Sequence, residues 1–373
     1  MINVDWQVKV YMRNENLMKV LFDGTCITEN PAGIGNYAYQ LLKEFARDNQ
    51  HEVGVLCLDP RYVPQGEKIT PIKVYSKYGK FLPFDVLKKF GKYDVYHQPD
   101  YIPHKFHGKT VITVHDMSHK VYPEYHPWKR VAVRNIFEKR MKNADVIMTV
   151  SESSKREIEK YWKVLPEKIH VTYLGTDDKY DDYSFCSKDN YELANNWNIP
   201  DNYILFVGTI EPRKNLQRLI KAFDMYKSLA NNNLKLVLAG DKGWLSEDIY
   251  NEASKARCSK DIIFTGYFPE HLKPALYAKA KALVYPSLYE GFGLPILEAL
   301  TMGIPVLTSN ISSMPEITGD IGIYVDPISI ESIENGIKNI TECDVDKYRL
   351  KGVAMKFKWV NCYKKTIECF ELI

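Results

Sequence analysis

The sequence lacks the long apolar run that a membrane-spanning helix requires. No apolar stretch approaches the roughly 18–20 residues needed to cross a bilayer. The first residues, MINVDWQVKVYMRNENL, carry charges where a secretory signal peptide has an apolar segment. We therefore expect a cytoplasmic protein.

The sequence also lacks an excess of either charge. It has 50 Lys and Arg residues against 47 Asp and Glu residues, which gives a net charge of +3. A dedicated nucleic-acid-binding protein has basic residues that dominate and cluster. We therefore do not expect a nucleic-acid partner.

Neither the cysteines nor the histidines form a metal-binding pattern. The seven cysteines are an odd number without C-x-x-C spacing, which also argues against a disulfide framework. Most histidines lie in one part of the chain: His97, His104, His107, His115, His119 and His126. No pair of them combines i, i+4 spacing on an expected helix with an acidic partner, so no metal site is expected.

The chain is long enough for two domains. Its 373 residues are 45% hydrophobic and 26% charged, as in soluble globular proteins. Strand and helix patterns alternate through residues 18–176, after an extension at 1–17, and this alternation is typical of parallel β-α-β units. A polar, aperiodic stretch at 175–190 predicts a linker, and the alternation resumes through residues 177–357. The sequence predicts an α/β protein with two doubly wound, Rossmann-like domains that face each other across a cleft.

The strongest motif is Glu-Gly-Phe-Gly-Leu-Pro-Ile-Leu-Glu at residues 290–298. It follows a buried strand pattern and leads into an expected helix whose first turn contains a proline, where the missing N–H costs nothing. Gly291 and Gly293 let the backbone approach a ligand, and the N–H groups at the helix start face an anion. Glu290 and Glu298 flank that site, and each can accept hydrogen bonds from vicinal hydroxyls. The motif predicts binding of a phosphate with a sugar on either side, and the alternative is a glycine-rich turn with two solvated glutamates.

A second motif, Gly-Thr-Ile-Glu-Pro-Arg-Lys-Asn, occupies residues 208–215. A strand pattern ends at Gly208 and a helix pattern starts near Asn215. Arg213 and Lys214 therefore project from a loop at the carboxyl end of a strand, where ligands bind in such sheets. Adjacent cations there would neutralise a diphosphate, although an isolated Arg-Lys pair is more often a solvated surface feature.

Together with Thr265-Gly266-Tyr267 and the stretch SNISSMPE at 309–316, these two motifs resemble family 4 (group 1) of the retaining, nucleotide-sugar-dependent glycosyltransferases. The resemblance covers about residues 18–373 and implies the two-domain GT-B architecture. The motif at 290–298 matches the E-x7-E element of that family. The resemblance therefore implies that Glu290 contacts donor-sugar hydroxyls and that Glu298 holds the nucleotide ribose.

The resemblance also assigns the basic pair. It implies that Arg213 and Lys214 bind the donor diphosphate and stabilise it as it leaves. Many members have an arginine directly after the strand glycine, where this chain has Thr209, so Arg213 has to supply that charge. A final helix at about residues 358–373 is expected to cross back and complete the N-terminal domain.

A glycine loop, Ala-Gly-Ile-Gly-Asn-Tyr at residues 32–37, resembles the family's loop near the donor phosphates and the acceptor. Gly33-x-Gly35-x-x-Ala38 also fits a dinucleotide-binding fingerprint, which would make the chain a dehydrogenase. That fingerprint turns tightly from strand to helix, whereas nine residues separate Asp23 from Gly33. We therefore prefer the glycosyltransferase.

His115 closes another strand pattern, in the sequence Thr-Val-His-Asp. A lone histidine in such a place is more often a hydrogen-bonded residue without a catalytic role. The resemblance favours a functional role, because family members present a histidine here to the hydroxymethyl group of the donor sugar.

The resemblance thus implies four catalytic residues: His115, Glu290, Arg213 and Lys214. It implies that the donor also lies against the residues of these loops: Gly33, Gly35, Gly208, Thr209, Gly240, Gly266, Tyr267, Gly291, Phe292, Gly293, Leu294 and Glu298. The reaction is expected to retain the anomeric configuration and to require neither a metal nor another cofactor.

The expected reaction is transfer of a hexose to a glycan, lipid-linked or protein-linked acceptor. GDP-mannose is the favoured donor and UDP-glucose the second, because the motif with Thr209 resembles that of bacterial-type mannosyltransferases that act on surface polysaccharides. The alternatives are a sugar-nucleotide epimerase with the same architecture and a sugar-nucleotide-binding protein without catalysis.

A locally basic stretch follows His115. Its cations are Lys120, Lys129, Arg130, Arg134, Lys139, Arg140 and Lys142, with Tyr125 and Trp128 nearby. We expect a solvated helix face. The alternative partners are an anionic lipid surface, which would make the protein peripheral to a membrane, and a charged acceptor.

Overall fold

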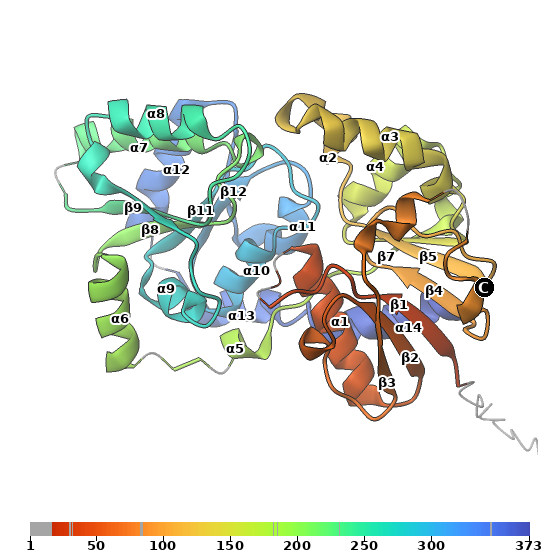
Figure 1. Ribbon diagram of the computed structural model, residues 1–373. Coiled ribbons are helices and arrows are strands. Elements are labelled where there is room, and N and C mark those ends of the chain that lie inside the picture. Colours follow the sequence, from red (N-terminus) through yellow and green to blue (C-terminus); the bar gives the residue numbers. More distant parts are fainter. Residues whose placement is uncertain are drawn as a thin grey trace, which may run out of the picture.

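The computed structural model describes residues 17–29, 31, 33–82, 85–181, 183–184, 186–230, 232–343 and 345–373. These residues form two α/β domains side by side, each with helices on both faces of a parallel sheet (Figure 1). Residues 1–16 of the expected N-terminal extension lie outside the described ranges.

The first domain is built on a parallel sheet with the strand order β3-β2-β1-β4-β5-β6-β7. Its strands are β1 (Lys19–Asp23), β2 (Glu52–Cys57), β3 (Ile69–Lys73), β4 (Val95–Gln98), β5 (Lys109–Val114), β6 (Val146–Thr149) and β7 (Ile169–Val171). Its α-helices are α1 (Ile34–Asp48), α2 (Ser118–Val121), α3 (Trp128–Lys142) and α4 (Glu152–Trp162). Strands such as β1 are nearly continuous apolar runs, because helices cover both faces of the sheet and bury Val20, Leu21 and Phe22 completely.

The second domain has a parallel sheet with the order β10-β9-β8-β11-β12-β13. Its strands are β8 (Tyr203–Val207), β9 (Lys235–Ala239), β10 (Ile262–Gly266), β11 (Ala282–Tyr285), β12 (Val306–Ser309) and β13 (Ile323–Val325). Its α-helices are α5 (Asp178–Asp181), α6 (Ser187–Trp197), α7 (Leu216–Leu229), α8 (Glu247–Lys255), α9 (Lys273–Lys279), α10 (Leu294–Thr301), α11 (Met314–Thr318), α12 (Ile330–Glu342) and α13 (Lys347–Ala354). In both sheets the chain order reverses beside the first strand of the domain, as in doubly wound folds.

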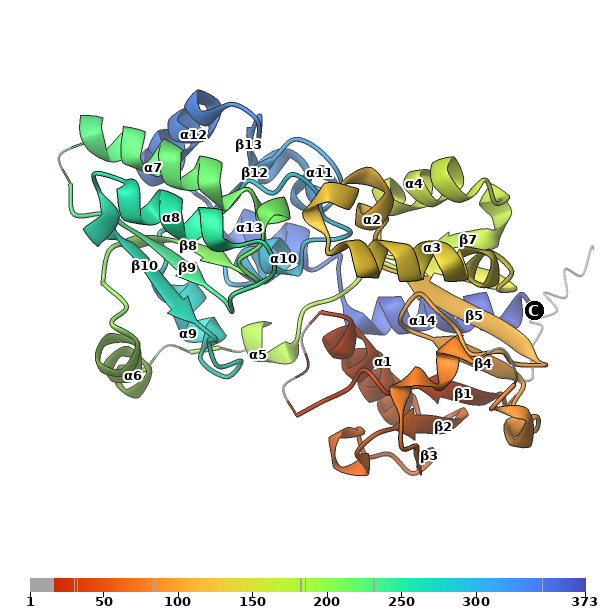
Figure 2. The same cartoon turned by 45° about the horizontal axis from the view of Figure 1, so that its top comes forward.

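The last helix, α14 (Trp359–Glu371), returns to the first domain and packs against α1. Figure 2 shows it in blue beside α1 and the first sheet. The Phe370 ring lies 6.4 Å from Phe45 and 5.5 Å from His97, and Tyr363 OH donates to Asp48 Oδ2 at 2.6 Å. The predicted return of the final helix is confirmed.

The structure contains several elements that the sequence did not predict. The stretch 175–190, predicted as a linker, contains α5 and the start of α6. The edge strands β3, β7 and β13 were also not predicted, because they are short and partly exposed and so lack a buried apolar run. Within the described ranges, no helix is both long and apolar enough to cross a bilayer. The cytoplasmic location stays a prediction.

The packing of α14 can be tested with Phe370→Ala. Phe370 is 1% exposed, so its truncation should lower the free energy of unfolding by about 3–5 kcal/mol through lost burial and a residual cavity. The control Leu372→Ala, at a side chain that is 60% exposed, should change it by less than about 0.5 kcal/mol. Urea denaturation measures both, and similar small effects of the two variants would contradict the packing role of α14.

Candidate active site

Three glycines mark the carboxyl edge of the second sheet. Gly208 follows β8, Gly240 follows β9 and Gly266 ends β10. Gly240 N donates to Gly266 O at 3.1 Å, and a Cβ on Gly240 would lie 2.0 Å from the Gly208 carbonyl oxygen. Close approach of these loops therefore requires glycine at 240. A Cβ on Gly266 would meet nothing within 4 Å, so the edge is open beside the half-exposed Tyr267.

The loops after β8 and β11 meet in a buried cluster of charges. Lys214 Nζ lies 2.6 Å from Glu290 Oε1, and Arg213 Nη1 lies 3.1 Å from Glu290 Oε2. Glu211 Oε1 accepts from Arg213 Nη2 at 2.6 Å, and Tyr285 OH accepts from Lys214 Nζ at 2.8 Å. The structure thus brings together three of the predicted catalytic residues. The exposed Thr209 lies just outside this cluster.

Glu290 is ionised within the cluster. Burial alone would raise its pKa, but Lys214 and Arg213 outweigh burial and hold the pKa of Glu290 below its usual value. Arg213 Nε and Glu211 Oε2 are buried and have no hydrogen-bond partner among the described residues. Such groups cost free energy until they are paired. The cluster therefore keeps hydrogen-bonding capacity for a ligand.

The loop at 290–293 is fixed by two serines of the loop after β12. Ser312 Oγ donates to Glu290 O at 2.6 Å, and Ser313 Oγ donates to Phe292 O at 2.7 Å. The loop ends at Gly293, whose φ of 109° favours glycine, and α10 begins at Leu294. The predicted transition from loop to helix at this motif therefore matches the structure.

Gly291 lies against the first domain. A Cβ on Gly291 would lie 1.9 Å from the His115 carbonyl oxygen, and Gly291 O accepts from Ser151 Oγ at 2.6 Å. The structure thus uses Gly291 for close approach of the two domains, and the predicted approach of its backbone to a ligand stays a prediction. In the N-terminal glycine loop, a Cβ on Gly35 would lie 2.6 Å from a backbone oxygen, so packing already requires that glycine. Gly33, with a φ of 51°, has open space around its Cα.

His115 follows β5 and borders the contact with Gly291. Its Nε2 lies 2.8 Å from the Pro99 carbonyl oxygen, so this nitrogen carries the proton. Burial lowers the pKa of the imidazole, which is therefore neutral at pH 7 with Nδ1 as its acceptor. The expectation of a hydrogen-bonded histidine at a strand end holds for Nε2. Nδ1 is therefore the ring nitrogen that is left to accept the predicted hydrogen bond from a donor hydroxyl.

The two glutamates of the E-x7-E element have different surroundings. Glu290 is bound by two cations, whereas Glu298 accepts a hydrogen bond from Tyr277 OH at 2.7 Å. Phe292, between them in the sequence, is buried with its ring 6.3 Å from Tyr173 and 5.9 Å from Phe357. Its side chain therefore packs at the domain boundary, away from the charge cluster.

The structure adds a contact that the sequence did not predict. Tyr289 OH accepts from Met117 N at 2.9 Å and donates to Glu157 on α4 of the first domain. Burial raises the pKa of Glu157 to about 7. No spacing rule links Tyr289 to Glu157, because they lie 132 residues apart in different domains.

Arg134 corrects the expectation of a solvated basic helix. It is 9% exposed, and its guanidinium carbon lies 3.8 Å from the centre of the Tyr101 ring. Burial would raise the pKa of Asp116, but Arg134 and Arg213 hold it below its usual range. Asp116 and Arg134 thus belong to the surroundings of the cluster, which only the tertiary structure reveals.

Other cations of α2 and α3 also form ion pairs or hydrogen bonds. Lys120 and Lys142 both pair with Glu138, and Arg140 donates to the backbone oxygen of Lys80. The solvated helix face therefore holds for only part of the stretch, namely Lys129 and Lys139. The Arg130 guanidinium carbon lies 4.9 Å from the centre of the Trp244 ring in the second domain. Contact of these cations with an anionic lipid surface stays a prediction.

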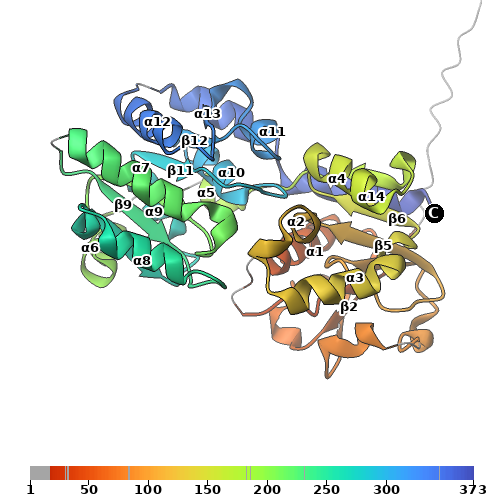
Figure 3. The same cartoon turned by 90° about the horizontal axis from the view of Figure 1, so that it is seen from above.

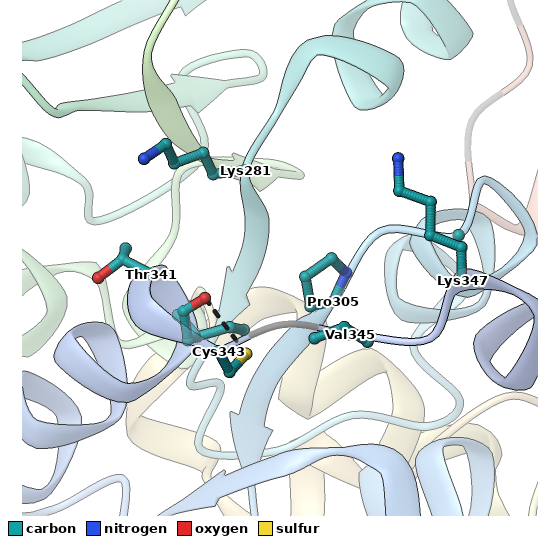
Figure 4. Close-up of a pocket in the computed structure, with 8 residues that line it drawn as sticks. Lys281, Pro305, Thr341, Cys343, Val345 and Lys347 are labelled. Carbon is teal, nitrogen blue, oxygen red and sulfur yellow. Dashed lines mark hydrogen bonds between the residues drawn. The ribbon is translucent and has the colours of Figure 1, made fainter.

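Two cavities of the protein lie away from this cluster. One of about 230 Å³ is bordered by Lys281 and Pro305, which directly precede β11 and β12, so it lies at the amino edge of the second sheet (Figure 4). The other, of about 400 Å³, lies in the first domain beside Thr25 and His104. Among the described residues, no group of three or more His, Cys, Asp and Glu side chains is arranged to hold a metal ion.

Solved structures share this architecture. Anabaena HepE in complex with UDP-glucose superposes with a TM-score of 0.74 at 18% identity, covering 95% of this chain and 100% of that one. A glycosyltransferase from Rickettsia africae superposes with a TM-score of 0.71 at 17% identity, covering 96% and 98%. Two doubly wound domains of this kind are the architecture of the GT-B class of glycosyltransferases.

The sequence comparisons identify the family. The model for Glycosyltransferase Family 4 matches residues 31–180, and the model for Glycosyl transferases group 1 matches residues 187–352. O-antigen chain mannosyltransferase B of Escherichia coli is 32% identical over 391 residues, which cover 95% of this chain and 100% of that protein. O-antigen chain mannosyltransferase RfbU of Salmonella typhimurium is 28% identical over 81% of each chain. The chain belongs to family 4, group 1, of the glycosyltransferases, and the resemblance seen in its motifs is confirmed.

The burial of Glu157, which raises the pKa of its carboxyl, predicts a pH dependence of stability. With a pKa of about 7 against an ordinary value of 4.5, folded Glu157 holds a proton that the unfolded chain has released. Its contribution to the free energy of unfolding is therefore full below about pH 4.5 and is lost as pH rises towards about 7. Glu157→Gln keeps the neutral form, so its stability relative to the wild type should increase between pH 5 and pH 8.

Urea denaturation across this pH range measures the difference. Glu159→Gln on the same helix is the control, because it lies two residues away and does not face Tyr289. Parallel pH profiles for the wild type and Glu157→Gln would show that Glu157 titrates normally.

Proposed function

We propose that the protein is a retaining hexosyltransferase that transfers mannose from GDP-mannose to a glycan acceptor. The observation that carries this proposal is the buried cluster in which Arg213 and Lys214 meet Glu290 at the open edge of the second sheet. Relatives that are 32% and 28% identical to the chain are named mannosyltransferases, which supports mannose as the sugar.

In this proposal the donor diphosphate binds beside Arg213 and Lys214. Phosphate oxygens take over part of the cation contacts that Glu290 makes in the free protein, and Arg213 Nε supplies a further donor. Charge-assisted bonds of this kind are short and strong. The Glu290 carboxylate is then released to accept hydrogen bonds from hydroxyls of the donor sugar, and the two cations neutralise the diphosphate without a divalent metal.

The reaction exchanges two bonds on one face of the anomeric carbon. The bond from C1 to the phosphate oxygen breaks while the acceptor hydroxyl oxygen bonds to C1, and the hydroxyl proton passes to the departing phosphate oxygen. Arg213 and Lys214 stabilise the negative charge that develops on that phosphate. Neutral His115 accepts from the sugar hydroxymethyl group through Nδ1 and so orients the sugar relative to the first domain.

The two domains divide the substrates between them. We assign the nucleotide to the second domain, residues 177–357, with Glu298 at the ribose. We assign the acceptor to the first domain, residues 18–176 completed by 358–373. The surroundings of Glu298 support this division. Its carboxylate is bonded to the neutral Tyr277 OH and, unlike Glu290, has no direct ion pair among the described residues, while the charge of Lys273 acts on it from farther away. Such a carboxylate can accept hydrogen bonds from ribose hydroxyls.

A donor comparison tests the proposed function. GDP-mannose should stabilise the protein by about 2.7 kcal/mol at a hundredfold excess over Kd and should be turned over. GDP-glucose differs only at C2 and UDP-glucose differs in base and sugar, so the pair separates recognition of the sugar from recognition of the base. Thermal unfolding and release of nucleoside diphosphate measure binding and turnover. Turnover of UDP-glucose without turnover of GDP-mannose would overturn the donor but not the family.

The two glutamates should separate in their effects. Glu298→Ala should weaken GDP and GDP-mannose alike, by roughly tenfold or more, since a lost hydrogen bond to a charged group is worth about 1.5–3 kcal/mol. Glu290→Ala leaves two cations for the diphosphate, so GDP should bind at least as tightly while transfer falls roughly 100-fold. Calorimetric titration and initial rates measure these effects, with exposed Glu331→Ala as the control. Equal losses of GDP affinity in both variants would contradict the assigned roles.

A further inference from the structure

The segment at 309–316 makes contacts with both domains that have no role in the proposed reaction as described so far. Its serines, Ser312 and Ser313, fix the loop at 290–293, here called the donor loop, through the carbonyl oxygens of Glu290 and Phe292. Its last residue, Glu316, lies on α11 at the boundary with the first domain. Figure 3 shows α11 next to α4.

Glu316 caps a helix of the other domain. Its Oε2 accepts from Glu152 N at 2.8 Å, and its Oε1 accepts from Ser153 N at 2.7 Å. These are the first N–H groups of α4, which have no partner within the helix and carry the positive end of its dipole. The next amide, Ser154 N, is bound by Ser151 Oγ at 3.0 Å within the same domain. The N–H groups in the first turn of α4 therefore have hydrogen-bond acceptors from both domains.

A carboxylate suits this position better than an amide would. Both of its oxygens accept, and its charge strengthens bonds to backbone N–H groups at a helix start. Tyr173 OH donates to Oε2 at 3.4 Å, and Arg156 lies 3.8 Å from Oε1. Only 18% of the Glu316 side chain is exposed, so solvent competes weakly with these bonds.

The cap adjoins the closest approach between the domains. Ser151, the residue before the capped turn, donates to Gly291 O at 2.6 Å, and Gly291 leaves no room for a Cβ beside the His115 carbonyl oxygen. Ser154 Oγ also lies 3.4 Å from His115 O. The start of α4 thus sits between His115 on one domain and the Glu290 loop on the other.

We propose that Glu316 is a positioning residue, which clamps the start of α4 to the second domain and thereby holds His115 against the Glu290 loop during transfer. This role rests on the proposed function, in which both residues contact the donor sugar. Binding of free nucleotide needs only the second domain, so the clamp acts on transfer and not on nucleotide affinity. A misplacement of about 1 Å between groups that act together can cost roughly 100-fold in rate.

The test compares Glu316→Gln and Glu316→Ala with Glu152→Gln. Glu316→Gln keeps the size but removes the charge and turns one acceptor into a donor that faces a backbone N–H. Glu152→Gln changes an exposed carboxylate in the same helix turn. Among the residues that the structure describes, this carboxylate has no hydrogen bond or ion pair with the second domain, so the variant serves as the matched control. Glu316→Asp retains the charge on a shorter side chain and should recover part of the loss.

Three measurements decide the proposal. Hydrogen exchange at single-residue resolution should speed up at Glu152 N and Ser153 N in Glu316→Gln and Glu316→Ala. It should not change at Ser154 N, which is capped within its own domain. Small-angle scattering should show a larger radius of gyration. The turnover number should fall roughly 10–100-fold with GDP affinity within twofold of the wild type. Glu152→Gln should change none of these.

Each outcome has one meaning. Unchanged exchange at the two amides, an unchanged radius of gyration or an unchanged turnover number in Glu316→Gln would overturn the clamp. Turnover and GDP affinity that fall together would also overturn it, because the variant would then be damaged within the second domain. A wild-type protein that transfers no sugar would overturn the proposed function, and exchange and scattering would then decide the clamp without any substrate.

Discussion

The rest of the candidate active site depends on the buried cluster of Arg213, Lys214 and Glu290. A charge in such a position is strongly destabilising when alone, and removal of one partner leaves the others uncompensated. Lys214 and Glu290 lie 76 residues apart, so their pairing requires the loops after β8 and β11 to be placed together. The neighbouring order of β8 and β11 in the sheet provides that placement.

The pairing of the cations with Glu290 also affects the other domain, because the donor loop contacts it. Glu290 holds the cations only while its own backbone is fixed, and Ser312 and Ser313 fix it. The next residue, Gly291, then meets the His115 backbone with no space for a side chain. The contact between the domains at Gly291 thus depends on the residues that hold the buried charges, and the bonds of Glu316 and Tyr289 to the first domain act beside it.

The sequence predicted what is encoded locally. Buried strands such as β1 and β8 are nearly continuous apolar runs, and the motif residues Arg213, Lys214 and Glu290 lie in the loops that follow strands. The short strands β3, β7 and β13 and the polar helix α6 lack such a signal, because their places are set by neighbouring strands and helices. The pairing of both cations with Glu290, and the packing of Gly291 on His115, are tertiary contacts that no spacing along the chain specifies.

The connection between the domains allows the cleft to open. The chain crosses the boundary twice, and the crossings pair at Thr176 and Lys358, so they form one hinge instead of two separate supports. The contacts of Ser151 with Gly291 and of Trp244 with Tyr125 are hydrogen bonds, which water can replace on opening. The apolar attachment of α14 lies wholly on the first domain. The boundary also carries aromatic contacts, because the Phe292 ring lies 6.3 Å from Tyr173 and the Tyr289 ring lies 6.0 Å from Tyr122. Opening about this hinge therefore has to separate these rings as well as the hydrogen bonds.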